Sequence, residues 1–268
     1  MRVNRDTAVC ISLAARPSNI GAAVHNAAYE ALGLNFIYSP RTTTDLPAAL
    51  AGVRALGIRG CSVSMPFKRD VIPLLDAVSD EAAAVGAVNT IVNDAGSLRG
   101  YNTDVGSVAW ALRRAALSPG DRVLVLGTGG MARACVAAAR RVASACHISV
   151  AYRSAVTGLT GVTPVAWDAR GAVDADVLIN ATPVGMAPED GVSPMPVERL
   201  SAFRLVVDAV AMPPESLMCR QARGLGVAVV TGQELALRQA MDQFELYTGV
   251  PAPEAVMAAA LAEVTASR

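Results

Sequence analysis

Short apolar runs alternate with amphipathic, alanine-rich segments along almost the whole chain. In the N-terminal part, apolar runs at 8–14, 34–40 and 60–66 predict strands, and the intervening segments 22–34 and 45–57 predict helices. This alternation is typical of βαβ units, in which a helix crosses over between consecutive strands of a parallel sheet. The sequence therefore predicts an α/β protein.

The character of the chain changes near residue 105. A helix is expected at 104–121, and the stretch "RVLVLGTGGMARACVAAARRV" (122–142) then runs from an apolar strand through a glycine turn into a helix. We expect two domains, at 1–104 and 105–233, and C-terminal helices at 234–268 that pack back on the first domain. The second domain continues with predicted strands at 147–153, 176–182, 204–210 and 226–232, and the chain ends with predicted helices at 233–249 and 253–264.

The glycine turn matches the dinucleotide-binding pattern G-x-G-x-x-G/A through Gly127, Gly129 and Ala132. The first glycine permits a tight turn, the second lets the backbone approach a pyrophosphate, and the small third residue permits close helix–strand packing. A glycine turn with only a packing role is the alternative. Because a strand precedes the turn and a helix follows it, we favour a Rossmann domain that binds a dinucleotide.

The strand after the glycine turn indicates which dinucleotide is bound. NAD-binding proteins usually end this strand with an acidic residue that binds the ribose 2′-hydroxyl. Here "HISVAYRSA" ends with Arg153 and Ser154 and has no acid. Arg153 can pair with a 2′-phosphate and Ser154 can donate a hydrogen bond to it, although Arg153 can also be an ordinary surface residue. The sequence favours NADP as the cofactor.

Lys68 is the only lysine in the chain, and every other basic side chain is arginine. An amine can give up a proton near neutral pH when its surroundings lower its pKa, whereas arginine stays charged. A lysine left over on a solvated turn is the alternative. Two Asn-Thr pairs follow, at Asn89 and Asn102, and Asp104 comes directly after the second. Although Asp104 can serve as a helix N-cap and the asparagines as turn residues, we expect Lys68 and Asp104 to manage a proton in a cleft between the domains.

The composition excludes several classes of protein. Apolar residues make up 53% of the chain, and the 23 basic residues balance 23 acidic ones, which indicates a folded core and no affinity for nucleic acid or anionic membranes. Five widely spaced cysteines indicate reduced thiols, and the presence of only two histidines argues against a histidine metal cluster. His25 is expected to pack or cap a helix. No apolar run is long enough to span a bilayer. We expect a cytoplasmic monomer or homodimer.

The order of the motifs resembles that of the shikimate and quinate dehydrogenase family. The matching segments are "VSMPFK", "GAVNT", "GYNTD", "GTGGMARA", "INATPVGM", "DAV" and "GQELALRQAMDQFELYTG". The resemblance implies an N-terminal α/β domain that binds substrate and carries catalysis, joined to a Rossmann NADP-binding domain. It also implies reversible hydride transfer between NADP(H) and a ring carbon of shikimate or 3-dehydroshikimate, a step in aromatic amino acid biosynthesis.

The resemblance also implies roles for single residues. Lys68 and Asp104 lie at the positions of the catalytic pair, and substrate contacts are implied for Ser64, Asn89 and Gln239. Cofactor contacts are implied for the phosphate loop, the 2′-phosphate segment and the nicotinamide segment: Gly127, Gly129, Gly130, Arg153, Ser154, Thr182, Val184 and Met186.

The substrate-contacting positions depart from the family pattern. Asn19 and Gly21 stand where the family has two serines that hold the substrate carboxylate, Ser62 replaces an asparagine, and Ala211 replaces a tyrosine. Ser18, Asn19 or Arg16 are candidates to replace the missing contacts. These changes are similar to those of a divergent shikimate dehydrogenase-like branch. Quinate or another polyol therefore remains an alternative substrate, and a weakly catalytic NADP-binding sensor remains an alternative function.

Overall fold

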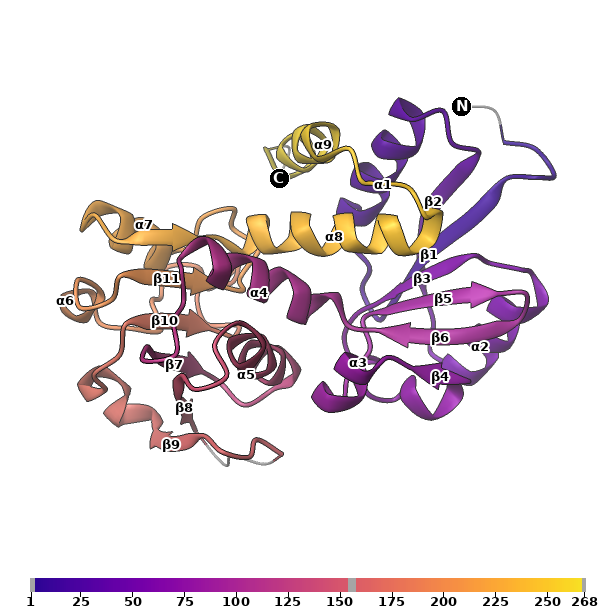
Figure 1. The fold of residues 1–268 in the computed structure, drawn as a ribbon. Helices are drawn as coiled ribbons and strands as arrows, with labels where there is room; N and C mark the ends of the chain where they lie inside the picture. The colour runs from indigo at the N-terminus through magenta and orange to yellow at the C-terminus, as the bar shows by residue number, and fades with distance from the viewer. Residues whose placement is uncertain (1–2, 154–157, 267–268) are drawn as a thin grey trace. The chain divides into compact units, whose positions relative to one another are not determined.

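The computed structural model describes residues 3–153 and 158–266, which form two units. Unit 1 comprises Met1–Thr103 and Leu237–Arg268, and unit 2 comprises Asp104–Ala236. Figure 1 shows the strands and helices of both. The predicted fold class, with an α/β domain, a Rossmann domain and C-terminal helices that return to the first domain, is confirmed.

Unit 1 contains a six-stranded sheet in the order β2-β1-β3-β5-β6-β4. Its strands are β1 (Ala8–Ala14), β2 (Phe36–Thr42), β3 (Gly60–Val63), β4 (Ala77–Val78), β5 (Thr90–Asp94) and β6 (Ser97–Tyr101). Its helices are α1 (Ile20–Ala31), α2 (Leu46–Ala55), α3 (Asp80–Val85), α9 (Glu254–Ala266) and most of α8 (Gly232–Thr248).

The sheet of unit 1 is mixed, because the parallel pairing expected from the βαβ pattern covers only some of its strands. β1 pairs in parallel with β2 and β3, but β5 runs antiparallel to both β3 and β6. β5 and β6 form a hairpin because Ala95 and Gly96 both adopt positive φ, at 50° and 95°, and consecutive positive φ values match the right-handed twist of the two strands. Asn89, which precedes β5, and Asn102, which follows β6, therefore lie together at the open end of the hairpin.

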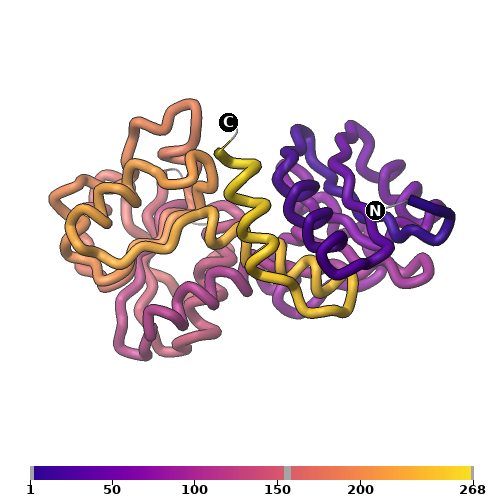
Figure 2. The backbone as a smooth tube through the Cα atoms, turned by 90° about the horizontal axis from the view of Figure 1, so that it is seen from above, coloured from indigo at the N-terminus to yellow at the C-terminus, as the bar shows by residue number. Residues whose placement is uncertain are grey.

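Helices cover both faces of the unit 1 sheet. Leu46, Leu50 and Val53 of α2 pack against one face, in a core with Ile11 and Val63. The opposite face carries Cys10, Tyr38 and Val92, which pack against residues of α1, α8 and α9. The C-terminal segment, yellow in Figure 2, supplies α9 and most of α8 to this second layer. The N-terminal and C-terminal segments of the chain therefore contribute to the same hydrophobic core.

Unit 2 contains a parallel sheet in the order β12-β11-β10-β7-β8-β9. From β7 the chain moves outward through β8 and β9, and from β10 it moves outward in the other direction, so β7 and β10 form the topological switch point. The elements are α4 (Thr103–Arg114), β7 (Arg122–Leu126), α5 (Gly130–Val142), β8 (His147–Tyr152), β9 (Thr163–Ala166), β10 (Val177–Asn180), α6 (Val197–Leu200), β11 (Leu205–Asp208), α7 (Leu217–Gly224) and β12 (Ala228–Val230).

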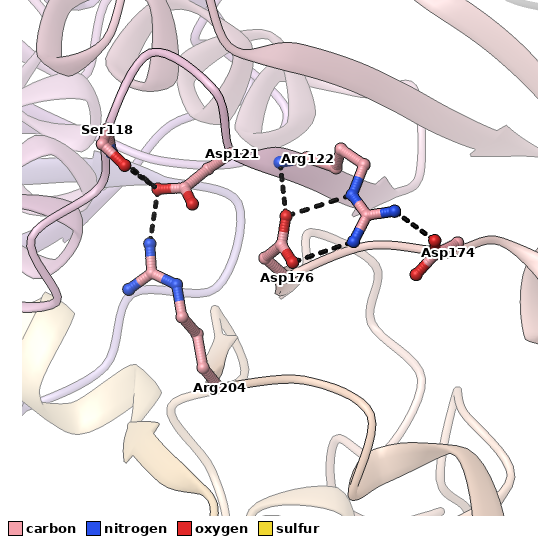
Figure 3. Close-up of polar contacts among 6 residues, drawn as sticks. All are labelled: Ser118, Asp121, Arg122, Asp174, Asp176 and Arg204. Atoms are coloured by element: carbon pink, nitrogen blue, oxygen red, sulfur yellow. Dashed lines mark hydrogen bonds and ion pairs between the residues drawn. The ribbon is translucent and has the colours of Figure 1, made fainter.

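Ion pairs tie together the amino ends of the unit 2 strands, as Figure 3 shows. Arg122 Nε and Nη2 donate to Asp176 Oδ2 and Oδ1 at 3.2 and 3.0 Å, and its backbone N–H donates to the same carboxylate at 2.8 Å. Arg204 pairs with Asp121 at 2.5 Å. Hydrogen bonds from Arg122 hold the pKa of Asp176 below its usual value. These contacts lie at the edge opposite the carboxyl ends of the strands, so they stabilise the sheet and leave the carboxyl edge to ligands.

Side chains cap the starts of several helices. Asp45 accepts a hydrogen bond from the backbone N–H of Ala48 at 2.9 Å and begins α2. Thr231 and Glu234 form a reciprocal capping box at the start of α8, with bonds of 2.9 and 3.3 Å. Among the described residues, no helix is long and apolar enough to cross a membrane.

Candidate active site

Gly127 lies at the switch point of the unit 2 sheet. Its N–H donates to Ala151 O at 2.9 Å, and its φ of 106° is a conformation that favours glycine. A Cβ at this position would lie 3.0 Å from Thr182 Cγ2 and 3.2 Å from Ala181 O. The glycine turn therefore packs directly against the segment that follows β10, at the edge where α/β sheets bind ligands.

The N-terminus of α5 has the form of a phosphate-binding site. Gly129 occupies the N-cap position with no side-chain capping bond, and α5 begins at Gly130. Apart from its chain neighbours, no described residue has a heavy atom within 4 Å of the position that a Cβ of Gly129 would take. The first backbone N–H groups of a helix have no intrahelical acceptor and bind anions well. Gly127, Gly129 and Gly130 therefore fit a dinucleotide pyrophosphate.

Arg153 lies directly after β8 and is exposed, so its guanidinium can reach a ribose 2′-phosphate. Ser154, the other predicted contact to this phosphate, lies outside the described residues. The strand end carries no acidic side chain that would repel a phosphate. The described part of this segment fits NADP, and both contacts stay predictions.

The predicted nicotinamide segment, with Thr182, Val184 and Met186, is shaped by Asn180. Asn180 Oδ1 accepts hydrogen bonds from the N–H and hydroxyl of Thr182 at 3.1 and 2.6 Å, and its Nδ2 donates to Val184 O at 3.2 Å. Met186 is exposed. The side-chain amide of Asn180, which is fully buried, therefore fixes the path of the chain from the end of β10 to Val184.

Asp208 at the end of β11 holds Asn180 in place. Its Oδ1 accepts from Asn180 Nδ2 at 2.9 Å and from Val210 N at 3.0 Å, and its Oδ2 accepts from the Ser216 hydroxyl. Complete burial raises the pKa of Asp208 above its ordinary value, and these hydrogen bonds offset part of the increase. The motifs "INATPVGM" and "DAV" contain both residues, but their sequence spacing alone does not reveal that they pair.

In unit 1, Ser64 and Lys68 follow the carboxyl end of β3. Ser64 is exposed, and its N–H donates to Leu13 O at 2.9 Å. Lys68 is half-buried, and its carbonyl accepts from Val88 N at 2.7 Å. The predicted strand at 60–66 ends earlier, at Val63, because turns begin at Met65. These turns place the Lys68 backbone beside the residue that precedes Asn89.

Asn89 links the two Asn-Thr segments. Its Oδ1 accepts from Thr103 N at 2.9 Å and from the Thr90 hydroxyl at 2.8 Å, and its Nδ2 donates to Thr103 Oγ1 at 3.0 Å. Asn102 Nδ2 donates to Ala87 O at 2.9 Å. Asp104 is the residue after Thr103 and is only 2% exposed. The asparagines therefore fix the beginning of α4, where Asp104 lies, and a contact from Asn89 to substrate stays a prediction.

The remaining predicted substrate contacts come from α1 and α8. Ser18 and Asn19 are exposed before α1, where Ser18 Oγ accepts from Ile20 N at 3.4 Å and Asn19 makes no side-chain capping bond. Gln239 is half-buried on α8. Gln243, one turn further along the same helix face, donates to Thr90 Oγ1 at 3.2 Å. Gln243 was not predicted from the sequence, although its i,i+4 spacing from Gln239 indicates that both side chains lie on one face of α8.

The side chains that could bind a metal ion are dispersed in the described ranges, 3–153 and 158–266. Within them no three His, Cys, Asp or Glu side chains are grouped so that they could hold a metal ion. The five cysteines are free thiols, and burial raises the pKa of Cys10 to about 12. Such thiols stay protonated at neutral pH and are poor ligands and nucleophiles.

Comparisons with known proteins agree with this geometry. Residues 18–91 match the family model "Shikimate dehydrogenase substrate binding domain", and residues 234–262 match "Shikimate 5'-dehydrogenase C-terminal domain". A shikimate dehydrogenase-like protein of Haemophilus influenzae is 42% identical over 92% of both chains. The NADP(+) shikimate dehydrogenase of Moorella thermoacetica is 40% identical over 90% of this chain and 87% of its own. A Thermus thermophilus shikimate 5-dehydrogenase, solved with NADP(H) and shikimate, superposes with a TM-score of 0.84 at 31% identity, covering 96% and 99% of the two chains.

Proposed function

Because the chain belongs to the shikimate dehydrogenase family, we propose that it is an NADP-dependent oxidoreductase acting on shikimate or a related hydroxy acid. The reaction is a reversible hydride transfer that interconverts a ring hydroxyl and a ketone. Unit 1 binds the substrate and unit 2 binds NADP. The reaction belongs to aromatic amino acid biosynthesis, and we place the enzyme in the cytoplasm.

The hydrogen-bond network of Asn89 is the observation that carries the proposal. Asn89 bonds to the backbone and hydroxyl of Thr103, which directly precedes Asp104. The neighbouring Val88 N–H bonds to the carbonyl of Lys68. The backbone of each proposed catalytic residue is therefore held next to this buried network, and such support helps to preorganise a site.

NADP(H), when bound, supplies or accepts the hydride. Lys68 Nζ, as an ammonium, donates a hydrogen bond to the substrate ketone oxygen, stabilises the negative charge that develops there, and gives its proton to the new alkoxide. In the oxidation direction the neutral amine takes that proton back. Asp104 orients the lysine and accepts a hydrogen bond from the neighbouring substrate hydroxyl.

The residues of unit 2 fit a dinucleotide, and Arg153 favours NADP. The open space at Gly129 and the uncapped start of α5 fit the pyrophosphate. Arg153 would pair with the 2′-phosphate. Val184 and Met186 would contact the nicotinamide from the segment that Asn180 holds.

The test is NADP reduction, followed by absorbance, with saturating shikimate and separately with quinate. We expect turnover of shikimate with preference for NADP over NAD. Lys68→Arg and Lys68→Met should lower kcat by about 100-fold or more, since general acid catalysis contributes that much, whereas Arg69→Ala, a change of the exposed neighbour, should not. Near-normal kcat in both Lys68 variants would refute the assignment of Lys68, and no turnover of any hydroxy acid would refute the proposed activity.

A further inference from the structure

Three hydroxyl groups meet on one face of the unit 1 sheet, and we call Ser12, Tyr38 and Ser62 the hydroxyl cluster. Ser12 of β1 is the register partner of Ser62 of β3, so the two side chains share a face. Tyr38 of β2 is the partner of Cys10, two residues before Ser12, and therefore projects on that face as well. The cluster faces the layer formed by α1 and α8.

Tyr38 and Ser62 have different roles in the hydrogen bond that joins them. Tyr38 is 3% exposed and its Oη is hydrogen-bonded to Ser62 Oγ. Burial raises the pKa of Tyr38, so the phenol keeps its proton at neutral pH. A phenol is more acidic than an aliphatic alcohol and is the better donor. We therefore assign Tyr38 as the donor of this bond, which leaves the hydrogen of the half-buried Ser62 hydroxyl to point toward another acceptor.

Ser12 contributes a third hydroxyl on the protein side of the cluster. Its Oγ is buried and meets hydrogen-bond geometry with no described residue, although it lies close enough to Tyr38 to offset part of the rise in the tyrosine pKa. A buried hydroxyl without an acceptor destabilises a protein, so such groups usually have a partner in the working state. Tyr38 Oη is the neighbour that can fill this role for Ser12, which leaves the half-buried Ser62 hydroxyl as the one open to a ligand.

Gly21 connects the cluster to the altered family positions. A Cβ at Gly21 would lie 3.1 Å from Tyr38 Cε1 and 3.2 Å from its Oη. The tyrosine hydroxyl thus lies beside the place where a side chain at position 21 would begin, which is where the family has a serine. Because the tyrosine ring packs this closely, a serine at position 21 would require the ring to move. The glycine is therefore what allows Tyr38 to occupy its observed position.

The cluster lies on the same face as the proposed substrate contacts. Ser64 follows Ser62 by two residues, and Thr90, which accepts from Gln243, is the register partner of Ser62. Side chains in such a row are neighbours on the sheet surface. A substrate held by Ser64 and Gln239 would therefore extend toward Ser62.

We propose that Ser62, oriented by Tyr38, binds the carboxylate of the substrate in place of the serine that Gly21 has replaced. Ser62 is then a specificity-determining residue that contacts the substrate, and Tyr38 is a positioning residue. The inference rests on the proposed function and makes it narrower: the substrate is a hydroxy acid that presents a carboxylate oxygen to Ser62. An uncharged polyol would gain less, because hydrogen bonds to charged acceptors are stronger.

The experiment compares shikimate with its methyl ester in wild type, Ser62→Ala and Tyr38→Phe. Losing one hydrogen bond to a carboxylate should raise KM for shikimate by about 10- to 100-fold, with kcat within a few-fold, and should change KM for the ester much less. Ser62→Thr, which keeps a hydroxyl, should recover most of the affinity. Ser39→Ala, on the same strand as Tyr38 but on the opposite face, is the matched control and should leave KM unchanged.

Equal effects on acid and ester, or unchanged KM in Ser62→Ala, would overturn the proposal. Calorimetric titration of the enzyme with shikimate measures the same contact without turnover. If wild type binds shikimate more tightly than Ser62→Ala but turns over nothing, the contact stands and the proposed function fails. If both proteins turn over shikimate and bind it equally, the function stands and the contact fails. If alanine at position 62 impairs folding, the comparison of Ser62→Thr with wild type still tests the contact.

Discussion

His25 should make the stability of unit 1 depend on pH. The side chain is fully buried on α1, and its ring stacks on Tyr38 with centroids 4.6 Å apart and an interplanar angle of 8°. Neither ring nitrogen meets hydrogen-bond geometry with a described residue. Burial lowers the pKa of His25 from 6.5 to about 4, although nearby Gln243 offsets part of that shift. The folded protein therefore binds this proton less readily than the unfolded chain does.

The sign and size of the effect follow from linkage. Above pH 6.5 the histidine is neutral in both states and its full contribution to stability is present. As the pH falls from 6.5 toward 4, the unfolded state takes up the proton and the folded state does not, so stability is lost. With these two pKa values the loss is about 2 kcal/mol at pH 5 and about 3 kcal/mol at pH 4.

The assay is urea unfolding of wild type and His25→Phe at pH 7 and pH 5. Phenylalanine keeps a ring in the stack and cannot take up a proton, so the variant should lose about 2 kcal/mol less than wild type between the two pH values. Circular dichroism follows both units, whereas the fluorescence of Trp110 and Trp167 reports only unit 2. His147→Phe, a change at the exposed histidine of β8, is the control. Equal losses in wild type and His25→Phe would refute the reasoning.

Three further predictions concern unit 2. Gly127→Ala should lower both stability and NADP affinity, because its Cβ would meet Thr182 at a strained φ, whereas Gly129→Ala should fold normally and lose NADP affinity by about 10-fold or more in a fluorescence titration. Asp208→Ala should cost about 3 kcal/mol in urea unfolding followed by tryptophan fluorescence, since three buried donors lose their acceptor; an unchanged midpoint would contradict the network. Arg122→Ala should lower the melting temperature by a few degrees at low salt and by less at high salt, because the pair is half-exposed.

Local patterns in the sequence determined the main elements of the fold. The strand at 8–14 was predicted with its observed bounds, and the strand–glycine–helix pattern around Gly127 located the Rossmann unit. Both depend on contacts and dihedral angles within a few residues, which composition and periodicity encode directly. β9 (Thr163–Ala166) was missed because this edge strand is short, mostly exposed and contains a proline, so it lacks an apolar run.

The hairpin of β5 and β6 shows where a local signal was present but was outweighed. The "NDAGS" stretch between the strands has the small and polar residues of a tight turn. The Asn-Thr pairs before and after this stretch favoured a ligand-binding role for the segment over a hairpin. The structure gives Asn89 a bond to Thr103, fourteen residues away, and that pairing exists only because the hairpin brings both ends together.

The sequence by itself determined the α/β class and pointed to a candidate dinucleotide site and the candidate catalytic residues Lys68 and Asp104, because each corresponds to a short motif. Only the tertiary structure decided how Gly21, Tyr38 and Ser62 relate to one another. They come from α1, β2 and β3 and meet because the strand order places β1 between β2 and β3 and lays α1 over that face. The effect of a substitution at one family position depends on which side chain fills the space that the substitution leaves. Only packing in three dimensions decides which side chain that is.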